Sequence, residues 1–420
     1  MTGLHLRAAP LIGLAATVLL VGSAAAQVTV LRGATLIDGS GAAPQSNVTI
    51  VIENGRLRDI GTGVTAPAGA TVIDLAGKFV VPGIINGHGH VGPPPRDRQL
   101  RQYALYGVTT TTSMASDPDD IVEFKAKQAA GDLRGARILT VKYRFTTLAG
   151  GGADYKTPEA ARRKVDEIAT HGADFIKVWL DPQGGRVPKL SREFVAAVLD
   201  QARKHGKLTM AHIVELADAR MAVDEGVNML VHNVRDQDIP ADFLATLKAR
   251  NVSVISTLAR EEGMFRAGGG TADDPFFTKG LTSEQRDGLT KKLDTLAKDP
   301  EGAASMRSFE QDKVNVKRVW DAGIRLGFGT DSGGASERYF IQGFSEHRQM
   351  DLLVQAGLTP MQVIQSFSKN NSEMLGIDKD FGTLAKGKAA DLLVLTKNPL
   401  DDIANMRTFE AVYLGGKKFE

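Results

Sequence analysis

The chain from residue 79 onward alternates between two patterns of hydrophobic and polar positions. Short apolar runs predict buried strands, whereas the stretches between them repeat apolar residues every three or four positions and predict amphipathic helices. The predicted strands are 79–85, 108–114, 137–143, 174–180, 207–212, 227–232, 252–257 and 324–330. The clearest predicted helices are 158–170, 191–204 and 216–224. Strands that alternate with helices in this way favour an α/β fold closed into a (β/α)8 TIM-like barrel over an open, doubly wound sheet.

Segments without helical periodicity at both ends of the chain predict a second, smaller domain. The first of them contains β-branched runs at short spacing, and Asn54-Gly55 is a typical hairpin turn. Strand character returns near the C-terminus, where residues 390–395 form a continuous apolar run. We therefore expect one β-sandwich domain built from both chain ends. The expected organisation is a signal peptide at 1–26, the β-sandwich domain at 27–78 and 379–420, and the barrel at 79–378.

Residues 1–26 have the layout of a secretory signal peptide. Arg7 provides a positive start, residues 8–21 are apolar, and Ala24-Ala25-Ala26 offers small side chains for cleavage. The alternative is an uncleaved membrane anchor, but the apolar run is short for a membrane span. The segment therefore predicts a periplasmic or secreted protein that is cleaved near Ala26 and has no stable membrane anchor.

The composition excludes several classes of protein and site. The 420 residues are 42% hydrophobic and 24% charged, and 51 lysines and arginines nearly balance 49 acids. This balance leaves no excess of basic residues for nucleic acid. The chain contains no cysteine, which excludes disulfides and thiolate metal sites. We expect a small molecule or a dipeptide as the partner and no nucleic acid, and the sequence allows a homo-oligomer.

Polar residues follow the predicted strands at the end where active sites form in such barrels. His88 and His90 are two residues apart on extended backbone, so both side chains can reach one ion. A single His-x-His pair is a weak motif, and each polar residue taken alone is as well explained by a structural role. Later strands carry further candidates at the same end: Lys177, His212, His232 and Asp331. Their recurrence predicts a metal centre.

Lys177 could take part in such a centre only after a chemical change. An ammonium group repels a cation and is costly to bury, so an unmodified lysine is no ligand. Burial lowers the pKa of a lysine, and the neutral amine can react with carbon dioxide to give a carbamate. The carbamate has two oxygens, which could bridge two divalent ions. The alternative is a charged lysine paired with a nearby acid.

Three motifs link the chain to a known family: residues 82–90, which end in Asn86-Gly87-His88-Gly89-His90, residues 329–332 around Asp331, and the C-terminal segment 382–392. With these motifs the mature chain resembles the amidohydrolase superfamily in its binuclear form with a carboxylated lysine. Within the superfamily it is most similar to the branch of imidazolonepropionase-like proteins and metal-dependent prolidases. Asn86 departs from the pattern, because members more often carry an acidic residue there.

The resemblance implies a role for each candidate residue. The implied ligands of the more buried ion are His88, His90, Lys177 and Asp331, and those of the second ion are carboxylated Lys177, His212 and His232. Imidazole and carboxylate ligands favour zinc for both ions, which would hold a bridging hydroxide. Asp331 would be the catalytic residue that takes the hydroxide proton and passes it to the leaving nitrogen.

The sequence therefore predicts a secreted dinuclear amidohydrolase that cleaves the amide bond of a dipeptide or N-acyl amino acid, as a prolidase or carboxypeptidase does. One alternative keeps the site but hydrolyses a cyclic amide, lactone, urea or carbamate, and a more distant one is a non-catalytic metal-binding scaffold. Loops after the strands are expected to set specificity, among them 148–157, 181–190 and the long connection 258–320. A substrate carboxylate would suit arginine best. The candidates near strand ends are Tyr143, Arg144, Arg235 and Arg260.

Overall fold

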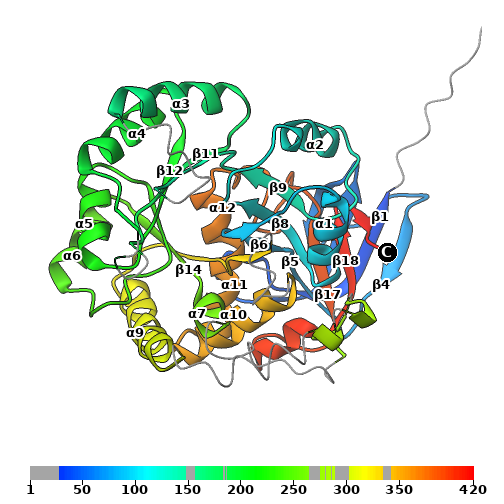
Figure 1. Ribbon diagram of the computed structural model, residues 1–420. Coiled ribbons are helices and arrows are strands. Elements are labelled where there is room, and N and C mark those ends of the chain that lie inside the picture. The colour runs from blue at the N-terminus through cyan, green and yellow to red at the C-terminus, as the bar shows by residue number, and fades with distance from the viewer. Residues whose placement is uncertain are drawn as a thin grey trace, which may run out of the picture.

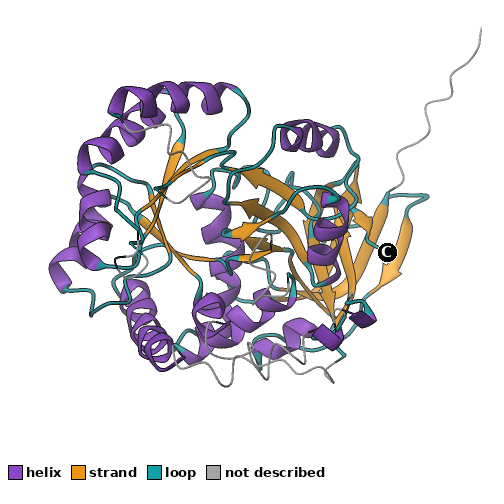
Figure 2. Ribbon diagram, viewed as in Figure 1, coloured by secondary structure: helices purple, strands orange, loops and turns teal. Residues whose placement is uncertain are grey.

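The structure is a computed structural model, which shows two parts side by side (Figures 1 and 2). In one part, helices surround short strands, and in the other a sheet brings the two ends of the chain together. The described residues are 28–147, 157–182, 185, 187–263, 275–279, 281–284, 286–288, 302–333 and 342–420. The predicted signal peptide, most of the loop 148–157 and much of the connection 258–320 lie outside these residues.

Strands from both chain ends form one mixed sheet of eight strands, in the order β19-β18-β17-β5-β1-β2-β3 with β4 beside β1. They are β1 (Thr29–Leu36), β2 (Gln45–Glu53), β3 (Arg56–Gly61), β4 (Thr71–Asp74), β5 (Phe79–Pro82), β17 (Leu392–Leu395), β18 (Phe409–Leu414) and β19 (Lys417–Lys418). The predicted hairpin turn is confirmed, because Asn54 and Gly55 have φ of 50° and 78° and join β2 to β3. The chain ends thus meet in one sheet, while the domain bounds stay a prediction.

The second part is built from parallel strands. They are β6 (Ile84–Asn86), β8 (Val108–Ser113), β9 (Arg137–Thr140), β10 (Arg144–Phe145), β11 (Phe175–Trp179), β12 (Leu208–His212), β13 (Met229–Val231), β14 (Ser253–Ser256) and β15 (Leu326–Phe328). They pair in two arcs, β6-β8-β9 and β10 to β15 in chain order. Backbone hydrogen bonds join the arcs at both junctions, among them those from Asp174 N to Thr140 O (2.8 Å) and from Gly87 N to Phe328 O (2.9 Å). The predicted parallel α/β fold is confirmed and is consistent with a TIM-like barrel, although the strand ladder is not closed.

Helices lie between the parallel strands and after the last of them. They are α1 (Arg96–Leu105), α2 (Asp120–Ala129), α3 (Pro158–Thr170), α4 (Arg192–Lys204), α5 (Leu216–Asp224), α6 (Ala241–Ala249), α7 (Leu258–Gly263), α9 (Gly302–Asp321), α10 (Phe344–Gln355), α11 (Pro360–Gln365), the π-helix η2 (Ser366–Asn370), α12 (Asn371–Met374) and the 3-10 helix η3 (Ile403–Arg407). Helix α3 begins as predicted, because the Thr157 hydroxyl accepts a hydrogen bond from Ala160 N (3.2 Å) and Pro158 follows. Such a cap contributes about 1 kcal/mol.

The helices bury one apolar face against the strands. On α4 the buried residues Phe194, Val195, Val198 and Leu199 recur at helical spacing and belong to the large core outside the strands. A smaller core lies on the other face of the strands and contains Phe175 of β11 and Met210 of β12. Since side chains alternate along a strand, residues two positions beyond these two also face inward. This alternation decides which polar groups reach the site.

The prediction of one strand at 79–85 is wrong, because the segment changes partners at Gly83. Residues before it form β5 in the mixed sheet, and residues after it form β6 beside β8. Gly83 N donates to Asp391 O (3.0 Å), which lies 308 positions away. A Cβ atom at Gly83 would collide with the side chain of Thr109, so this close crossing requires glycine. The crossing fixes the start of β6, which leads directly to the first histidine of the site.

Among the described residues, no helix is both long enough and apolar enough to cross a membrane.

Candidate metal centre

The six predicted ligands all lie at or near the carboxyl ends of parallel strands, where barrel active sites form. His88 falls between β6 and β7 (Gly89–His90), and Asp331 falls between β15 and β16 (Ser332–Gly333). Strands β7 and β16 pair in parallel, which brings these two turns together. The remaining ligand candidates are Lys177 in β11, His212 at the end of β12 and His232 directly after β13.

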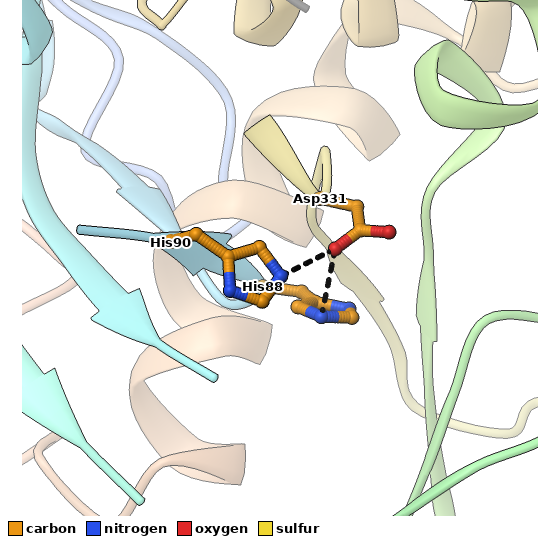
Figure 3. A group of neighbouring side chains, drawn as sticks. All are labelled: His88, His90 and Asp331. Carbon is orange, nitrogen blue, oxygen red and sulfur yellow. Dashed lines mark hydrogen bonds and ion pairs between the residues drawn. The ribbon is translucent and has the colours of Figure 1, made fainter. Parts of the chain in front are cut away.

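His88, His90 and Asp331 form a compact group, which we call the first half of the centre (Figure 3). Asp331 Oδ1 lies 2.6 Å from His90 Nε2 and 3.3 Å from His88 Nε2. Each residue offers one ligand atom, and the three atoms lie within 4.8 Å of one another. Among the described residues, this is the group of histidines and acids that lies close enough together to hold a metal ion. Two imidazoles and a carboxylate around one point are a suitable donor set for a divalent cation.

The backbone around the first half is drawn tightly together. The amides of Thr330 and Asp331 both donate to the carbonyl oxygen of His88, at 3.0 and 2.7 Å. A Cβ atom at Gly329 would lie 2.7 Å from His88 Cβ, so only glycine permits this approach. Asp331 and His232 have φ of 57° and 69°, a left-handed conformation that is unfavourable for residues other than glycine. Such strain is typical of functional sites, where the surrounding contacts hold it in place.

Lys177 lies beside the first half. Its side chain is buried, and Nζ is 3.1 Å from His88 Nε2. Burial lowers the pKa of the lysine to about 7, an effect that Asp331 opposes and that Arg144 and Arg260 reinforce. A large fraction of the amine is therefore neutral near neutral pH, which is the form that carbon dioxide can attack. The environment suits the carbamate that the sequence predicted.

His212 and His232 form the second half of the centre, with ring centroids 4.3 Å apart. His232 also lies 4.8 Å from the ring of His88. Burial holds the pKa of both residues well below the usual value, so both are neutral, as a metal ligand must be. Nε2 of each ring is buried, and neither atom has a hydrogen-bond partner among the residues described. Buried polar atoms without partners need an explanation, and a metal ion would supply it.

The other nitrogen of His232 is held in place by a hydroxyl group. His232 Nδ1 lies 2.5 Å from Thr257 Oγ1, just beyond the end of β14. This contact leaves Nε2 to face the centre, which is the usual arrangement behind a histidine ligand. Asp181 Oδ2 lies 3.6 Å from His212 Nε2 and places a second carboxylate near this half.

A chain of ion pairs runs from Asp331 away from the histidines. Arg260 Nε donates to Asp331 Oδ2 (2.9 Å), while Arg260 Nη1 lies 2.7 Å from Glu261 Oε1. Glu261 in turn pairs with Arg235 at 3.3 Å. Burial alone would raise the pKa of Asp331, but His88 and His90 hold it well below its usual value. Asp331 is therefore an ionised carboxylate with one oxygen toward the histidines and one toward Arg260.

Glu346 at the start of α10 supports the first half from behind. Its Oε1 accepts hydrogen bonds from Asn86 Nδ2 (2.6 Å), Thr330 Oγ1 (2.8 Å) and Ser332 Oγ (2.9 Å). Asn86 Oδ1 also accepts from His88 N at 3.0 Å. An acid at position 86 would place a second carboxylate next to that of Glu346, and the two would repel each other. This repulsion explains why the chain carries an amide at this position.

The four predicted substrate-binding residues do not have the same environment. Arg260 contacts Asp331 directly, and Arg235 is one step away, through Glu261. Arg144 lies over the ring of Trp179, with Cζ 4.9 Å from the centroid. Tyr143 packs edge-on against Phe145, and Lys164 Nζ lies 5.1 Å from its ring. Arg260 thus contacts a predicted ligand directly, and Arg144 is the strand-register partner of another, Lys177.

Three residues near the centre were absent from the prediction. Trp179 follows Lys177 by two positions and packs edge-on against His212, with centroids 5.1 Å apart. The alternation rule could have found it, because both residues must share a face of β11. Thr257 and Glu346 touch the site only through contacts between distant segments, and their local sequence is unremarkable for a strand end and a helix start.

The chain is similar to known proteins in sequence and in fold. A sequence model described as "Amidohydrolase family" matches residues 79–418. The chain is 41% identical over 64 residues to a dihydroorotase of Trichlorobacter lovleyi, a match that spans only 15% of each chain. It is 26% identical over 350 residues to a 5-methylthioadenosine/S-adenosylhomocysteine deaminase of Halobacterium salinarum, covering 78% of this chain and 75% of that one. A crystal structure of a candidate prolidase from Bifidobacterium longum superposes with a TM-score of 0.76 at 25% identity, covering 93% of this chain and 94% of the other.

Proposed function

The chain belongs to the amidohydrolase family, as its motifs predicted, and from this premise we propose that it is a metal-dependent hydrolase of amide bonds in dipeptides or N-acyl amino acids. The family membership and the prolidase-like structural neighbours support a hydrolase acting on small molecules. The observation that carries the proposal is the convergence of His88, His90 and Asp331 on one point. Lys177 and the second half lie beside it, and Nε2 of each imidazole in that half has no hydrogen-bond partner among the described residues.

The donor set fits two divalent ions. His88, His90, Lys177 and Asp331 would hold one ion, and carboxylated Lys177, His212 and His232 would hold the other. Zinc is the metal that imidazole and carboxylate donors favour. When bound, the ions would lower the pKa of a water molecule and polarise the carbonyl group of the substrate.

The side chains of the protein supply the remaining chemistry. The neutral amine of Lys177 adds to the carbon of carbon dioxide, and loss of one proton leaves the carbamate anion. Asp331, held as an ionised carboxylate by the neighbouring histidines, accepts the proton of the attacking water. It then delivers this proton to the amide nitrogen as the carbon–nitrogen bond breaks. Arg260 keeps the carboxylate oriented through Oδ2 during both transfers.

We also propose that the protein acts outside the cytoplasm. The support is the pattern of residues 1–26, with a basic start, an apolar run and small residues before Gln27. N-terminal sequencing of the protein recovered from the periplasm or the medium would test this. A chain that starts at Gln27 would agree with the proposal, and an uncleaved chain in the cytoplasm would contradict it.

The function is tested by metal content together with hydrolysis of a substrate panel. We expect about two ions per chain and turnover of Xaa-Pro dipeptides or N-acyl amino acids that a chelator abolishes. The matched variant is Asp331→Asn, which should keep much of its metal yet lose about 10²–10⁴-fold in kcat, the usual share of acid–base catalysis. Near wild-type turnover by this variant would remove the proton-transfer role.

Other outcomes separate the alternatives. Two ions with turnover confined to ring amides, lactones, ureas or carbamates would keep the site and replace the substrate class. Two ions without turnover of any of these compounds would favour the metal-binding scaffold. Less than one ion per folded chain would contradict the metal centre itself.

A further inference from the structure

The inner face of β10 and β11 carries two buried donors beside the metal centre. Lys177 and Trp179 are two and four positions beyond Phe175, which belongs to the inner core, so both side chains face inward. Arg144 is the register partner of Lys177, and its neighbour Phe145 belongs to the outer core, so Arg144 faces inward as well. The contact between Arg144 and the Trp179 ring agrees with this placement.

The guanidinium of Arg144 differs from those of Arg235 and Arg260. The latter two pair with Glu261, and Arg260 also pairs with Asp331. Arg144 makes no ion pair with any residue that the structure describes, and its Nε atom is buried without a hydrogen-bond partner there. Burial lowers the pKa of this arginine, because desolvation disfavours the cation, and the charge of Asp331 opposes this effect without forming an ion pair.

Trp179 adds a second donor of the same kind. Its Nε1 is buried and also has no acceptor among the described residues. The indole lies between Arg144 and His212, with which it makes ring contacts. A guanidinium and an indole N–H can only donate, so together they require an acceptor that the described residues do not supply. A carboxylate next to the apolar indole face satisfies both donors and the charge.

We propose that Arg144, together with the N–H group of Trp179, binds the carboxylate of the substrate. This inference rests on the proposed function, because it assumes that a substrate reaches the centre formed by His88, His90 and Asp331. It assigns the residues that recognise the free carboxylate that dipeptides and N-acyl amino acids share on the nitrogen side of the amide bond. Arg235 and Arg260 are excluded from this role because their donors already bind acids.

The test compares ligands that differ only in the carboxylate. Metal-loaded wild type and Arg144→Met are assayed on Ala-Pro and N-acetyl-L-phenylalanine and on the C-terminal amides of both. Methionine keeps much of the length of the side chain but removes every donor. We expect KM for the carboxylates to rise about 10–100-fold in the variant, as for loss of a charged hydrogen bond, with kcat within about threefold. KM and kcat for the two C-terminal amides, which lack the carboxylate, should change by less than about threefold.

Two further variants and a control accompany this comparison. Trp179→Phe keeps the ring and removes the N–H, so it should raise KM for the carboxylates by a smaller factor, about 3–10-fold. Arg144→Lys keeps the charge without the planar fork and should fall between wild type and Arg144→Met. Arg163→Ala, an exposed arginine on α3, should behave as wild type. If Arg144→Met does not fold, Trp179→Phe and Arg144→Lys decide the question.

Calorimetry with L-proline and L-prolinamide separates this inference from the proposed function. Binding of L-proline that depends on Arg144, without turnover of any amide, would support the carboxylate site and contradict the proposed function. Equal affinity of the wild type for proline and its amide would overturn the inference. So would a loss of metal from Arg144→Met that weakens both ligands equally, since Arg144 would then serve carboxylated Lys177.

Discussion

The two halves of the metal centre differ in how their polar atoms are satisfied. In the first half, Asp331 contacts Nε2 of both His88 and His90, and His88 Nδ1 is the one imidazole atom of this half that is buried without a partner among the described residues. In the second half, Nε2 of His212 and of His232 is buried without a partner in the described part of the chain. An unsatisfied buried group costs about 1–3 kcal/mol. We infer that the first half is held together by the protein and that the second depends on its ligand.

The hydrogen bonds that hold the ligand residues in place are also more numerous in the first half than in the second. The turns that carry the first half are joined by Glu346, which accepts hydrogen bonds from Asn86, Thr330 and Ser332. Behind the second half, Thr257 is the hydroxyl that contacts His232. Farther back, Asn233 donates to the buried Asp312, whose Oδ2 has no partner among the described residues. Among the described residues, fewer hydrogen bonds therefore support the second half than the first.

Replacing Lys177 with alanine should have the largest effect, because the proposed carbamate is the one ligand shared by both halves. We expect metal content to fall from about two ions to one or fewer per chain. Loss of an ion removes several kcal/mol of transition-state stabilisation, so kcat/KM should fall by about 10³-fold or more. Elemental analysis and hydrolysis assays on the same samples would measure both.

Chemical rescue gives this prediction its control. Bicarbonate together with a short carboxylic acid should restore part of the metal and of the activity to Lys177→Ala, because the acid can replace the carbamate. The same addition should do nothing for Asp331→Asn, which keeps Lys177 and with it the proposed carbamate. Unchanged metal content in Lys177→Ala would contradict the bridging role.

Replacing Asp312, the buried acid behind the second half, should give the next largest effect. The effect is a change in how the free energy of unfolding depends on pH. Burial raises the pKa of Asp312 to about 7, with a further contribution from Glu261. The folded protein therefore keeps this proton between about pH 4 and 7, where the unfolded chain has released it. Stability is greatest below this range and falls as pH rises through it, by up to about 4 kcal/mol.

Asp312→Asn should remove this slope, so that the variant exceeds the wild type in stability at pH 8 and matches it near pH 4. Urea unfolding of metal-loaded protein between pH 4 and 8 would measure the difference. Glu310→Gln, an exposed acid on the same helix, serves as the control and should leave the slope unchanged. Equal slopes in Asp312→Asn and the wild type would show that Asp312 is ionised throughout.

Local patterns were sufficient to predict most of the fold and to name the candidate metal ligands, which stay a prediction. Apart from β10, which was not predicted, the parallel strands from residue 108 onward and helices such as α3 lie where apolar periodicity and capping residues placed them. The split at Gly83 could not be predicted, because the chain turns there in response to Asp391, at the far end of the sequence. Residues 79–85 form one continuous apolar run, so the sequence alone does not show that its two ends pair in different sheets.

The site, like the fold, contains residues that a local pattern identifies and residues that only long-range contacts reveal. The candidate ligands could be named because each lies in or soon after an apolar strand, and one rule about the carboxyl ends of strands selects them. Arg144 was a candidate because of its charge and its place near a strand end, but its distinction from Arg235 and Arg260 rests on which arginines already bind acids. Glu346 contacts Asn86 across 260 positions, and such contacts have no local pattern.

Thr257→Val should have the smallest effect and is the most direct test of the comparison between the halves. The hydroxyl holds Nδ1 of His232, and valine keeps the shape of the side chain while removing this contact. Loss of such a contact behind a histidine ligand typically weakens metal binding about 10–100-fold, so one ion should be released at lower chelator concentration while the other stays. The matched control is Ser256→Ala on the same strand end, whose buried hydroxyl contacts Gln349 and no histidine. Simultaneous release of both ions from Thr257→Val would show that the halves act as one unit and that their different support has no consequence.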